Sequence, residues 1–279
     1  MLKKALQLLK KNPIIILCYA VFLAINILLI FFLYPKSFGA DTYTKDGMLD
    51  YSLYMATMRN ILIALLLVFI ISLFYISGFY NMIREAVFSG KTRLYSFLDG
   101  IKKYLGRVIL SVLLTAAIVI VGSILLGLLS IPFTIMAVSN GTGSLLVITL
   151  VIMLFTLLLV IIPTPFIVLW LPALFLEDTG VIRSLKLGAK AGARNYWRLL
   201  LASFILVLPQ AIYSILNYNV MMRGSLFTAG YYGLLGIMAI LSLVYNVYAF
   251  IIYHEYRNGL ITIQQQQEEI IKPSLEELE

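Results

Sequence analysis

The sequence contains only one cysteine, Cys18, and only one histidine, His254. A single cysteine excludes an internal disulfide framework and any metal site built from several cysteines. A single histidine excludes a zinc site built from a histidine pair, although residues 254–258 depart from the motif His-Glu-x-x-His only at Asn258. We therefore expect no metal and no other cofactor.

Charged residues are also scarce, at 12% of the chain against 62% apolar residues. No aspartate lies at the centre of a long apolar segment, which excludes an aspartyl pair within a membrane. The glycine-rich loops that bind nucleotide phosphates are missing as well. A serine nucleophile would depend on His254, at the border of an apolar segment. The sequence thus predicts a non-enzymatic protein, and we expect no nucleic-acid partner.

The sequence is instead dominated by apolar segments, and soluble domains contain about twice this share of charged residues. About 20 apolar residues cross a hydrocarbon core of about 30 Å, so lipid is the expected solvent. The first segment is too long for the apolar region of a cleaved signal peptide, and we expect a permanent anchor. The predicted fold class is all-α, an integral membrane helical bundle of about six transmembrane helices in three hairpins. The predicted spans are 13–33, 61–83, 108–130, 145–171, 198–216 and 230–253.

The basic residues predict the orientation of these spans. Seventeen lysines and arginines lie on one side of the six spans and four on the other. The side rich in basic residues is expected to face the cytoplasm. This predicts a multi-pass protein of the cell membrane with both termini cytoplasmic. One membrane domain would cover residues 1–260, followed by a polar, acidic cytoplasmic tail over 261–279, either a frayed helical extension or disordered.

Three stretches that precede outward spans resemble one another: "LKKNPIIIL", "IKKYLGRVIL" and "ARNYWRLLL". Their basic residues Lys10, Lys102 and Arg194 are 92 positions apart each time. The inward spans end alike, with an acid and a glycine that suits a helix C-cap. This favours three hairpins of one plan; chance similarity is the alternative, because basic residues precede apolar runs in many membrane proteins. The acid and glycine pairs are Glu85 and Gly90, Glu177 and Gly180, and Glu255 and Gly259.

Two of these stretches predict amphipathic helices in the headgroup plane, facing anionic lipid or a protein partner. The alternative is an ordinary solvated face. In the later helix, Ile182, Leu185 and Ala189 are expected to face apolar surroundings. In the earlier one, an apolar arc contains Leu94, Phe97, Leu98, Ile101, Tyr104 and Leu105. The candidate lipid or partner surface comprises Arg183, Lys186, Lys190, Arg194, Lys102 and Lys103.

Three prolines, Pro163, Pro165 and Pro172, interrupt the fourth span. Each proline removes a backbone donor and clashes with the preceding turn. We expect a kink near 163–165 and an end to this helix by about Asp178. A broken helix around a substrate is the alternative.

Polar residues near the centres of spans are few. Asn26, Gln210 and Asn246 are the candidates for a polar cavity, although hydrogen bonds between helices are the more common role of such residues.

The stretch "PALFLEDTGVIRSLKLGAKAGARNYWRLL", residues 172–200, resembles a loose group of bacterial and archaeal polytopic membrane proteins. The group includes the membrane domain fused to some glycerophosphodiester phosphodiesterases. The resemblance covers mostly residues 60–255, and the phosphodiesterase domain itself is absent, so it implies no such activity here. Its motif positions are Pro172, Glu177, Arg183, Ser184, Tyr196 and Trp197.

Two functions remain open from the sequence. The first is a non-enzymatic scaffold or accessory subunit with a basic cytoplasmic surface for anionic lipid or a protein partner. The second is a transporter or lipid-handling protein for a neutral or amphiphilic substrate, which a cavity lined by Asn26, Gln210 and Asn246 would favour.

Overall fold

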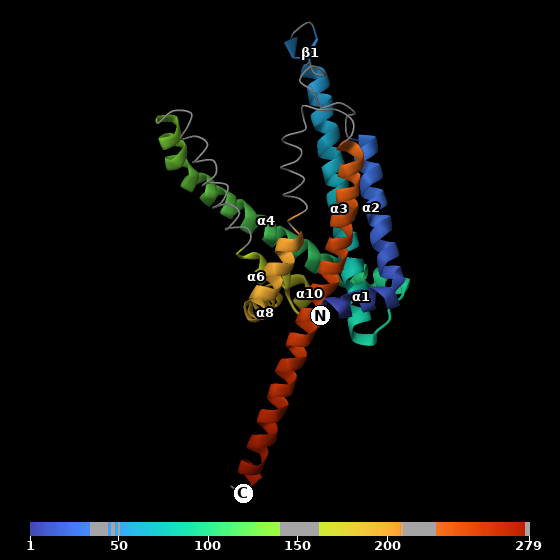
Figure 1. The fold of residues 1–279 in the computed structure, drawn as a ribbon, viewed down its shortest axis with the longest axis vertical. Helices are drawn as coiled ribbons and strands as arrows, with labels where there is room; N and C mark the ends of the chain where they lie inside the picture. The colour runs from blue at the N-terminus through green and yellow to red at the C-terminus, as the bar shows by residue number, and fades with distance from the viewer. Residues whose placement is uncertain are drawn as a thin grey trace. The chain divides into compact units, whose positions relative to one another are not determined.

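The computed structural model describes residues 1–33, 44–45, 48–49, 51–139, 162–206, 208 and 227–276. These residues are almost all helical, as predicted for the fold class (Figure 1). The exceptions include two short antiparallel strands, β1 (Thr44–Lys45) and β2 (Met48–Leu49). Most of the predicted span 145–171 and much of 198–216, including Gln210, lie outside the described residues.

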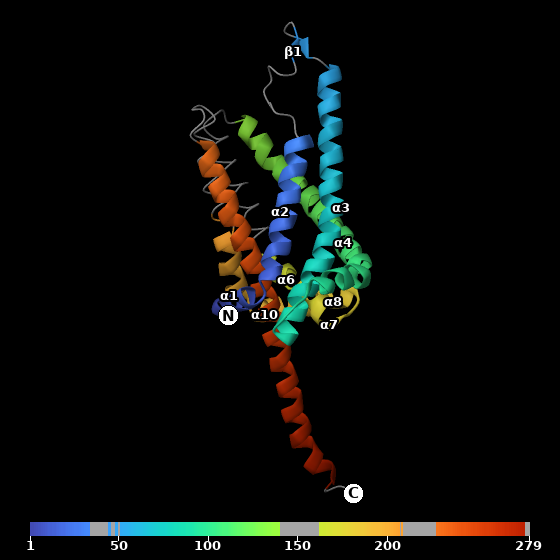
Figure 2. The same cartoon turned by 90° about the vertical axis from the view of Figure 1, so that its right-hand side faces the viewer.

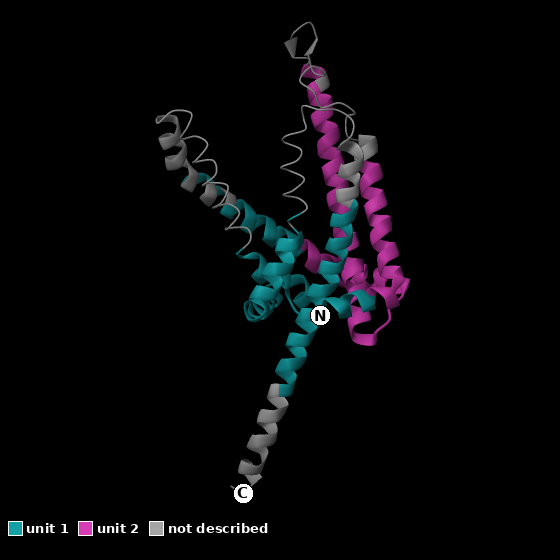
Figure 3. Ribbon diagram, in the orientation of Figure 1, with its two compact units in different colours: residues 1–8, 110–279 teal, residues 9–109 magenta. Residues whose placement is uncertain are grey.

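Two compact units make up the chain, residues 9–109 and residues 1–8 with 110–279 (Figure 3). The first unit contains α2 (Pro13–Leu33), α3 (Tyr51–Ser89) and the start of α4 (Leu94–Ser139). Aromatic rings join α2 to α3: the rings of Phe22 and Tyr75 stack with centroids 3.8 Å apart. The predicted span 13–33 coincides with α2.

A sharp bend of 88° separates α1 (Leu2–Lys11) from α2. Pro13 explains its position. A proline disfavours the helical conformation for the preceding residue, here Asn12, yet it suits the first position of a new helix. The Asn12 side chain is buried and hydrogen-bonds the turn that follows α3, donating to the Gly90 carbonyl at 3.1 Å and accepting from the Thr92 amide at 2.9 Å.

The second unit contains α6 (Thr164–Val168), α7 (Trp170–Glu177), α8 (Val181–Arg194), a helix over Tyr196–Leu206, and α10 (Phe227–Glu276). Helices α6, α7 and α8 pack together (Figure 2). Phe175 of α7 contacts Phe250 of α10, with ring centroids 6.3 Å apart. Both side chains are fully buried, so these two aromatic residues are part of the packed contact between α7 and α10.

Within the described residues, three helical segments are long and apolar enough to cross a membrane, or four if the bent pair α1 and α2 forms one span. The three are Tyr54–Ser89, Leu94–Gly122 and Gly236–Thr262. These apolar helices fit a membrane protein.

The prolines of residues 163–172 break the helix at one position that the sequence did not predict. The helix ends at Glu177, as predicted, but an unexpected break separates α6 from α7 at Leu169. Pro172 explains the break, because its ring has no N–H to donate to Val168 and clashes with that carbonyl. Pro163 precedes the first residue of α6. The residues before 162 are not described, so the kink at 163–165 stays a prediction.

The three glycines expected to cap helices have three different roles. Gly90 follows α3 with φ of +76°, and its role as a C-cap is confirmed. The prediction is wrong for Gly180, which is the N-cap of α8 with φ of −67°. Asp178 takes the left-handed conformation after α7 instead, with φ of 51°, which aspartate tolerates better than most residues. It is also wrong for Gly259, which lies inside α10.

Candidate basic surface on helix α8

Helix α8 lies with its backbone directly against α6 and α7. A Cβ added at Gly188 would lie 2.7 Å from the Trp170 backbone nitrogen. At Gly192 it would overlap the carbonyl oxygen of Pro165. Small residues at successive turns permit such close helix packing. The packed face of α8 is therefore formed by Val181, Ser184, Gly188, Ala191 and Gly192, all of them buried.

A polar contact holds the first turn of α8 against α7. The indole Nε1 of Trp170 donates to the Val181 carbonyl and to the Ser184 hydroxyl, each at 3.1 Å. The Ser184 hydroxyl in turn donates to the Val181 carbonyl at 2.8 Å. Trp170 is 3% exposed, so its N–H group needs these acceptors. This contact sets the rotation of α8 about its own axis.

With that rotation set, the four predicted basic residues of α8 are exposed on one face. Arg183, Lys186, Lys190 and Arg194 recur at intervals of three and four residues, which align along a helix. They lie on the far side of the helix from Gly188 and Ser184. Their exposure was predicted, and it is confirmed.

The residues expected to face apolar surroundings, Ile182, Leu185 and Ala189, do not form the face of α8 that packs within the chain, and their apolar surroundings stay a prediction. Ile182 is 66% exposed, and Leu185 and Ala189 are only half-buried. The physical reason is that glycine and serine let two backbones approach more closely than leucine or isoleucine do. These three residues therefore form a separate apolar strip between the packed face and the basic face.

The basic residues of α4, Lys102 and Lys103, are exposed. The Lys103 ammonium lies 5.2 Å from the centre of the Tyr104 ring. They belong to a different compact unit from α8, so the expectation that the two basic stretches lie close together stays a prediction. The amphipathic stretch also continues directly into the span within α4.

The apolar arc expected over residues 94–105 does not form the packed face of α4. Leu94 and Leu98 are more than half exposed, and Tyr104 is the one fully buried member of the arc. A Cβ added at Gly100 would lie 2.6 Å from both the Asn81 Cβ and the Ser77 carbonyl oxygen. The packed face of this segment is therefore Ser96, Gly100, Tyr104 and Val108.

Glu85 organises the turn between α3 and α4. Its Oε2 accepts hydrogen bonds from the hydroxyls of Thr92, at 2.8 Å, and Ser96. Asn81 donates to the Ser96 carbonyl at 2.7 Å. A carboxylate that accepts two hydroxyl bonds forms stronger hydrogen bonds than a neutral acceptor would. Glu85 therefore binds the start of α4 to α3.

Two of the three candidate cavity residues bond within their own helices. The Asn26 amide donates to the Phe22 carbonyl at 2.8 Å, and the Asn246 amide donates to the Ser242 carbonyl at 2.9 Å. The described residues include no group of three or more histidine, cysteine, aspartate or glutamate side chains that could hold a metal ion.

The described residues are helical, and their apolar helices of spanning length fit the class of helical membrane proteins. The chain belongs to the family of the domain of unknown function DUF7847, whose model matches residues 1–254. No curated protein and no solved structure matches the chain.

Proposed function

We propose that the protein is a non-enzymatic integral membrane protein, a scaffold or accessory subunit, whose basic face on α8 binds anionic lipid headgroups. The observation that carries this proposal is the exposure of Arg183, Lys186, Lys190 and Arg194 on a helix whose opposite face is closely packed. Each basic residue near an anionic leaflet contributes about 1 kcal/mol. Four such residues would together favour anionic lipid strongly at low salt.

The strip of Ile182, Leu185 and Ala189 supports the same orientation. An interfacial helix places apolar residues toward the acyl chains and basic residues toward phosphate. Ile182 is largely exposed within the chain, so lipid would cover it in this arrangement. The strip and the basic face lie side by side on α8, which suits a helix in the membrane plane.

The proposal includes the finer topology predicted from the sequence: six spans in three hairpins in the cell membrane, with both termini cytoplasmic. The distribution of lysine and arginine supports it. In a Cys18→Ser background, a cysteine replacing Asp46 should react with a membrane-impermeant thiol reagent on intact cells. A cysteine replacing Lys102 should react only after the cells are opened. The reverse pattern would overturn the orientation.

The lipid-binding role is tested by replacing Arg183, Lys186, Lys190 and Arg194 together by glutamine. The anionic lipid that co-purifies with the protein, measured by mass spectrometry, should fall several-fold while the protein stays folded. Exchanging arginine for lysine and lysine for arginine at the same positions is the matched control, because it keeps the charge. Unchanged lipid content would contradict the proposal and leave the basic face as a topology signal only.

The same variants separate lipid from a protein partner. Loss of a cytoplasmic protein with unchanged lipid would favour the accessory-subunit role through protein contact. The hydrogen bonds of Asn26 and Asn246 within their own helices support the scaffold over the transporter of a neutral or amphiphilic substrate. A prokaryotic source and a relationship to the membrane domain fused to glycerophosphodiester phosphodiesterases rest on the sequence resemblance alone.

A further inference from the structure

Two cavities of different chemistry meet beside the Tyr196–Leu206 helix. One is an apolar groove of about 540 Å³ between this helix and α10. The other, of about 630 Å³, is lined by polar and charged side chains that include Arg194, Asn195 and Tyr256. Arg198 and Met1 line both cavities, so the two volumes adjoin. Every lining residue belongs to the compact unit of residues 1–8 and 110–279.

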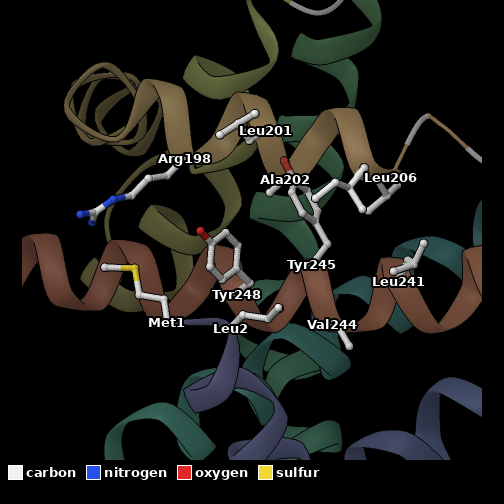
Figure 4. Close-up of a pocket in the computed structure, with 11 residues that line it drawn as sticks. Met1, Leu2, Arg198, Leu201, Ala202, Leu206, Leu241, Val244, Tyr245 and Tyr248 are labelled. Carbon is white, nitrogen blue, oxygen red and sulfur yellow. The ribbon is translucent and has the colours of Figure 1, made fainter.

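The apolar groove is polar at one end only. Figure 4 shows Arg198, Tyr248 and Met1 at that end and Leu206 and Leu241 at the other. Leu201, Ala202 and Val244 line the length between them. The hydroxyl of Tyr245, the polar group along this length, is hydrogen-bonded to Ser203 at 2.7 Å. The groove therefore suits a hydrocarbon chain, with its polar end at Arg198.

The polar cavity is suited to an anion. Arg194, the last residue of α8, and Arg198, in the helix that follows, both line it. Glu255 also lines this cavity, but its Oε1 lies 2.7 Å from the Lys4 ammonium, which compensates its charge. Arginine binds phosphate through two parallel hydrogen bonds, which makes a pair of arginines a strong phosphate site.

Aromatic side chains indicate the depth of this polar end. Trp197 is 72% exposed and also lines the polar cavity, next to Tyr196. Tryptophan and tyrosine gather where headgroups meet the hydrocarbon region. The meeting point of the two cavities is therefore suited to the level of lipid phosphate.

We propose that the two cavities together form a site for one anionic phospholipid, with an acyl chain in the groove and the phosphate at Arg194 and Arg198. The groove volume lies within the range of about 300–1,000 Å³ typical of small-molecule sites. An amphiphile with a negative headgroup is the chemistry that uses both cavities at once. This inference rests on the proposed function, since it assigns one discrete lipid at the end of the basic face of α8.

The test measures lipid bound to the purified full chain in detergent by native mass spectrometry. Phosphatidylglycerol and phosphatidylcholine with identical acyl chains are the two probes. One phosphatidylglycerol should be retained per chain, with an affinity about tenfold above that of phosphatidylcholine. Arg198→Gln should lower the phosphatidylglycerol affinity about fivefold and leave phosphatidylcholine nearly unchanged.

Filling the groove is the second arm of the test. Ala202→Trp should reduce the affinity for both lipids at least tenfold, because the indole occupies the chain site. Val244→Phe fills the same groove from α10 and should act in the same direction, which guards against a folding defect in one variant. Phe204→Trp is the matched control, since Phe204 is exposed on the same helix and does not line the groove. Retention of lipid by both groove variants, or equal affinity for the two lipids, overturns the inference.

A separate variant distinguishes this site from the wider basic surface. Arg183→Gln, Lys186→Gln and Lys190→Gln change residues that line neither cavity. If the proposed function holds, this triple variant loses loosely bound anionic lipid but keeps the one retained phosphatidylglycerol. If the triple variant loses nothing while Ala202→Trp loses its lipid, the basic-surface proposal fails and the discrete site stands.

Discussion

At the junction of α3 and α4, Gly100 lies against Ser77 and Gly78; at the junction of α7 and α8, Gly188 lies against Leu169 and Trp170. A buried serine precedes each glycine by one turn, Ser96 in the first junction and Ser184 in the second. Both pairs of residues are 88 positions apart in the chain. The two junctions therefore bring an amphipathic helix against an incoming helix through the same small-residue contact.

The polar groups around the two serines differ. In the first junction Ser96 donates to Glu85, and in the second Ser184 accepts from Trp170. The acid 92 positions after Glu85 is Glu177, and it interacts with α10 instead, accepting from the Tyr253 hydroxyl at 3.3 Å and lying 3.1 Å from Arg257 Nε. An acid at a matching place in the sequence thus has two different roles, one within a turn and one between helices.

The helices also continue differently after the shared contact. Helix α4 runs without a break to Ser139, whereas α8 ends at Arg194. Asn195 adopts a non-helical conformation, and its amide side chain donates to the Ala191 carbonyl at 3.1 Å. The break makes α8 a separate helix, and its basic face is consequently independent of the direction of the next span.

The largest expected effect is at Gly192, where α8 comes closest to α6. Gly192→Ala would place a methyl group onto the Pro165 carbonyl oxygen, and backbone atoms cannot move aside cheaply. We expect a loss of about 3 kcal/mol or more, measured as thermal unfolding in detergent. Gly180→Ala is the control, because nothing lies within 4 Å of its added Cβ. Equal stability of the two variants would contradict the close approach.

The corresponding change in the other junction should cost somewhat less. Gly100→Ala meets the Asn81 Cβ and the Ser77 carbonyl oxygen at 2.6 Å, a smaller overlap than the 2.1 Å between the added Cβ and the Pro165 carbonyl oxygen at Gly192. We expect about 2 kcal/mol of destabilisation in the same assay. In contrast, Gly106→Ala in the same helix meets no atom within 4 Å and should stabilise by up to about 1 kcal/mol. A destabilised Gly106→Ala would refute the assignment of the packed face.

The hydrogen bonds of the Trp170 indole distinguish the junction of α7 and α8 from the junction of α3 and α4. Trp170→Phe keeps most of the ring but removes the N–H donor to Ser184 and Val181. We expect a loss of about 1–2 kcal/mol from the hydrogen bonds and the lost ring volume. Trp197→Phe changes the same residue type at an exposed position and should be nearly neutral. Similar unfolding temperatures for both variants would mean that the indole N–H does not stabilise the junction.

The smallest effect is expected from the acid between α7 and α10. Glu177→Gln should cost about 0.5 kcal/mol, because its ion pair with Arg257 is partly exposed to solvent. Glu85→Gln should cost about 1–2 kcal/mol, since it weakens two hydroxyl bonds to a charged acceptor. Denaturation of the two variants side by side tests this order. A larger loss of stability in Glu177→Gln than in Glu85→Gln would contradict this order.

The sequence also contains a pattern that indicates these two junctions. Ser96 and Gly100, like Ser184 and Gly188, are small residues four positions apart, the pattern typical of close helix packing in membranes. The basic residues that predicted the repeat have a spacing of 92, whereas the shared packing contact has a spacing of 88. The acids Glu85 and Glu177 are also 92 positions apart, and they lie differently in their helices, because α3 continues beyond Glu85 to Ser89 whereas α7 ends at Glu177 itself.

The sequence by itself determined the features that depend on local composition and periodicity. A continuous apolar run determined α2 over 13–33, and the spacing of the basic residues placed Arg183, Lys186 and Lys190 on one face of a helix. The acid pair at the end of the fourth predicted span also marked where α7 stops. These features follow from the residues themselves, since helical geometry alone aligns positions three and four apart.

Only the tertiary structure decided which face of each helix packs. On α8, either the apolar strip with Ile182 or the small-residue face with Gly188 could have packed against α6 and α7. Amino-acid composition alone favoured burial of the apolar strip. The backbone of α6 and α7 selected the second, because close contact over Gly188 and Gly192 gains more packed surface than a looser contact over Ile182. The same contact leaves Ile182 of the apolar strip exposed. The break that Pro172 causes at Leu169 sets the direction of α7 against α8.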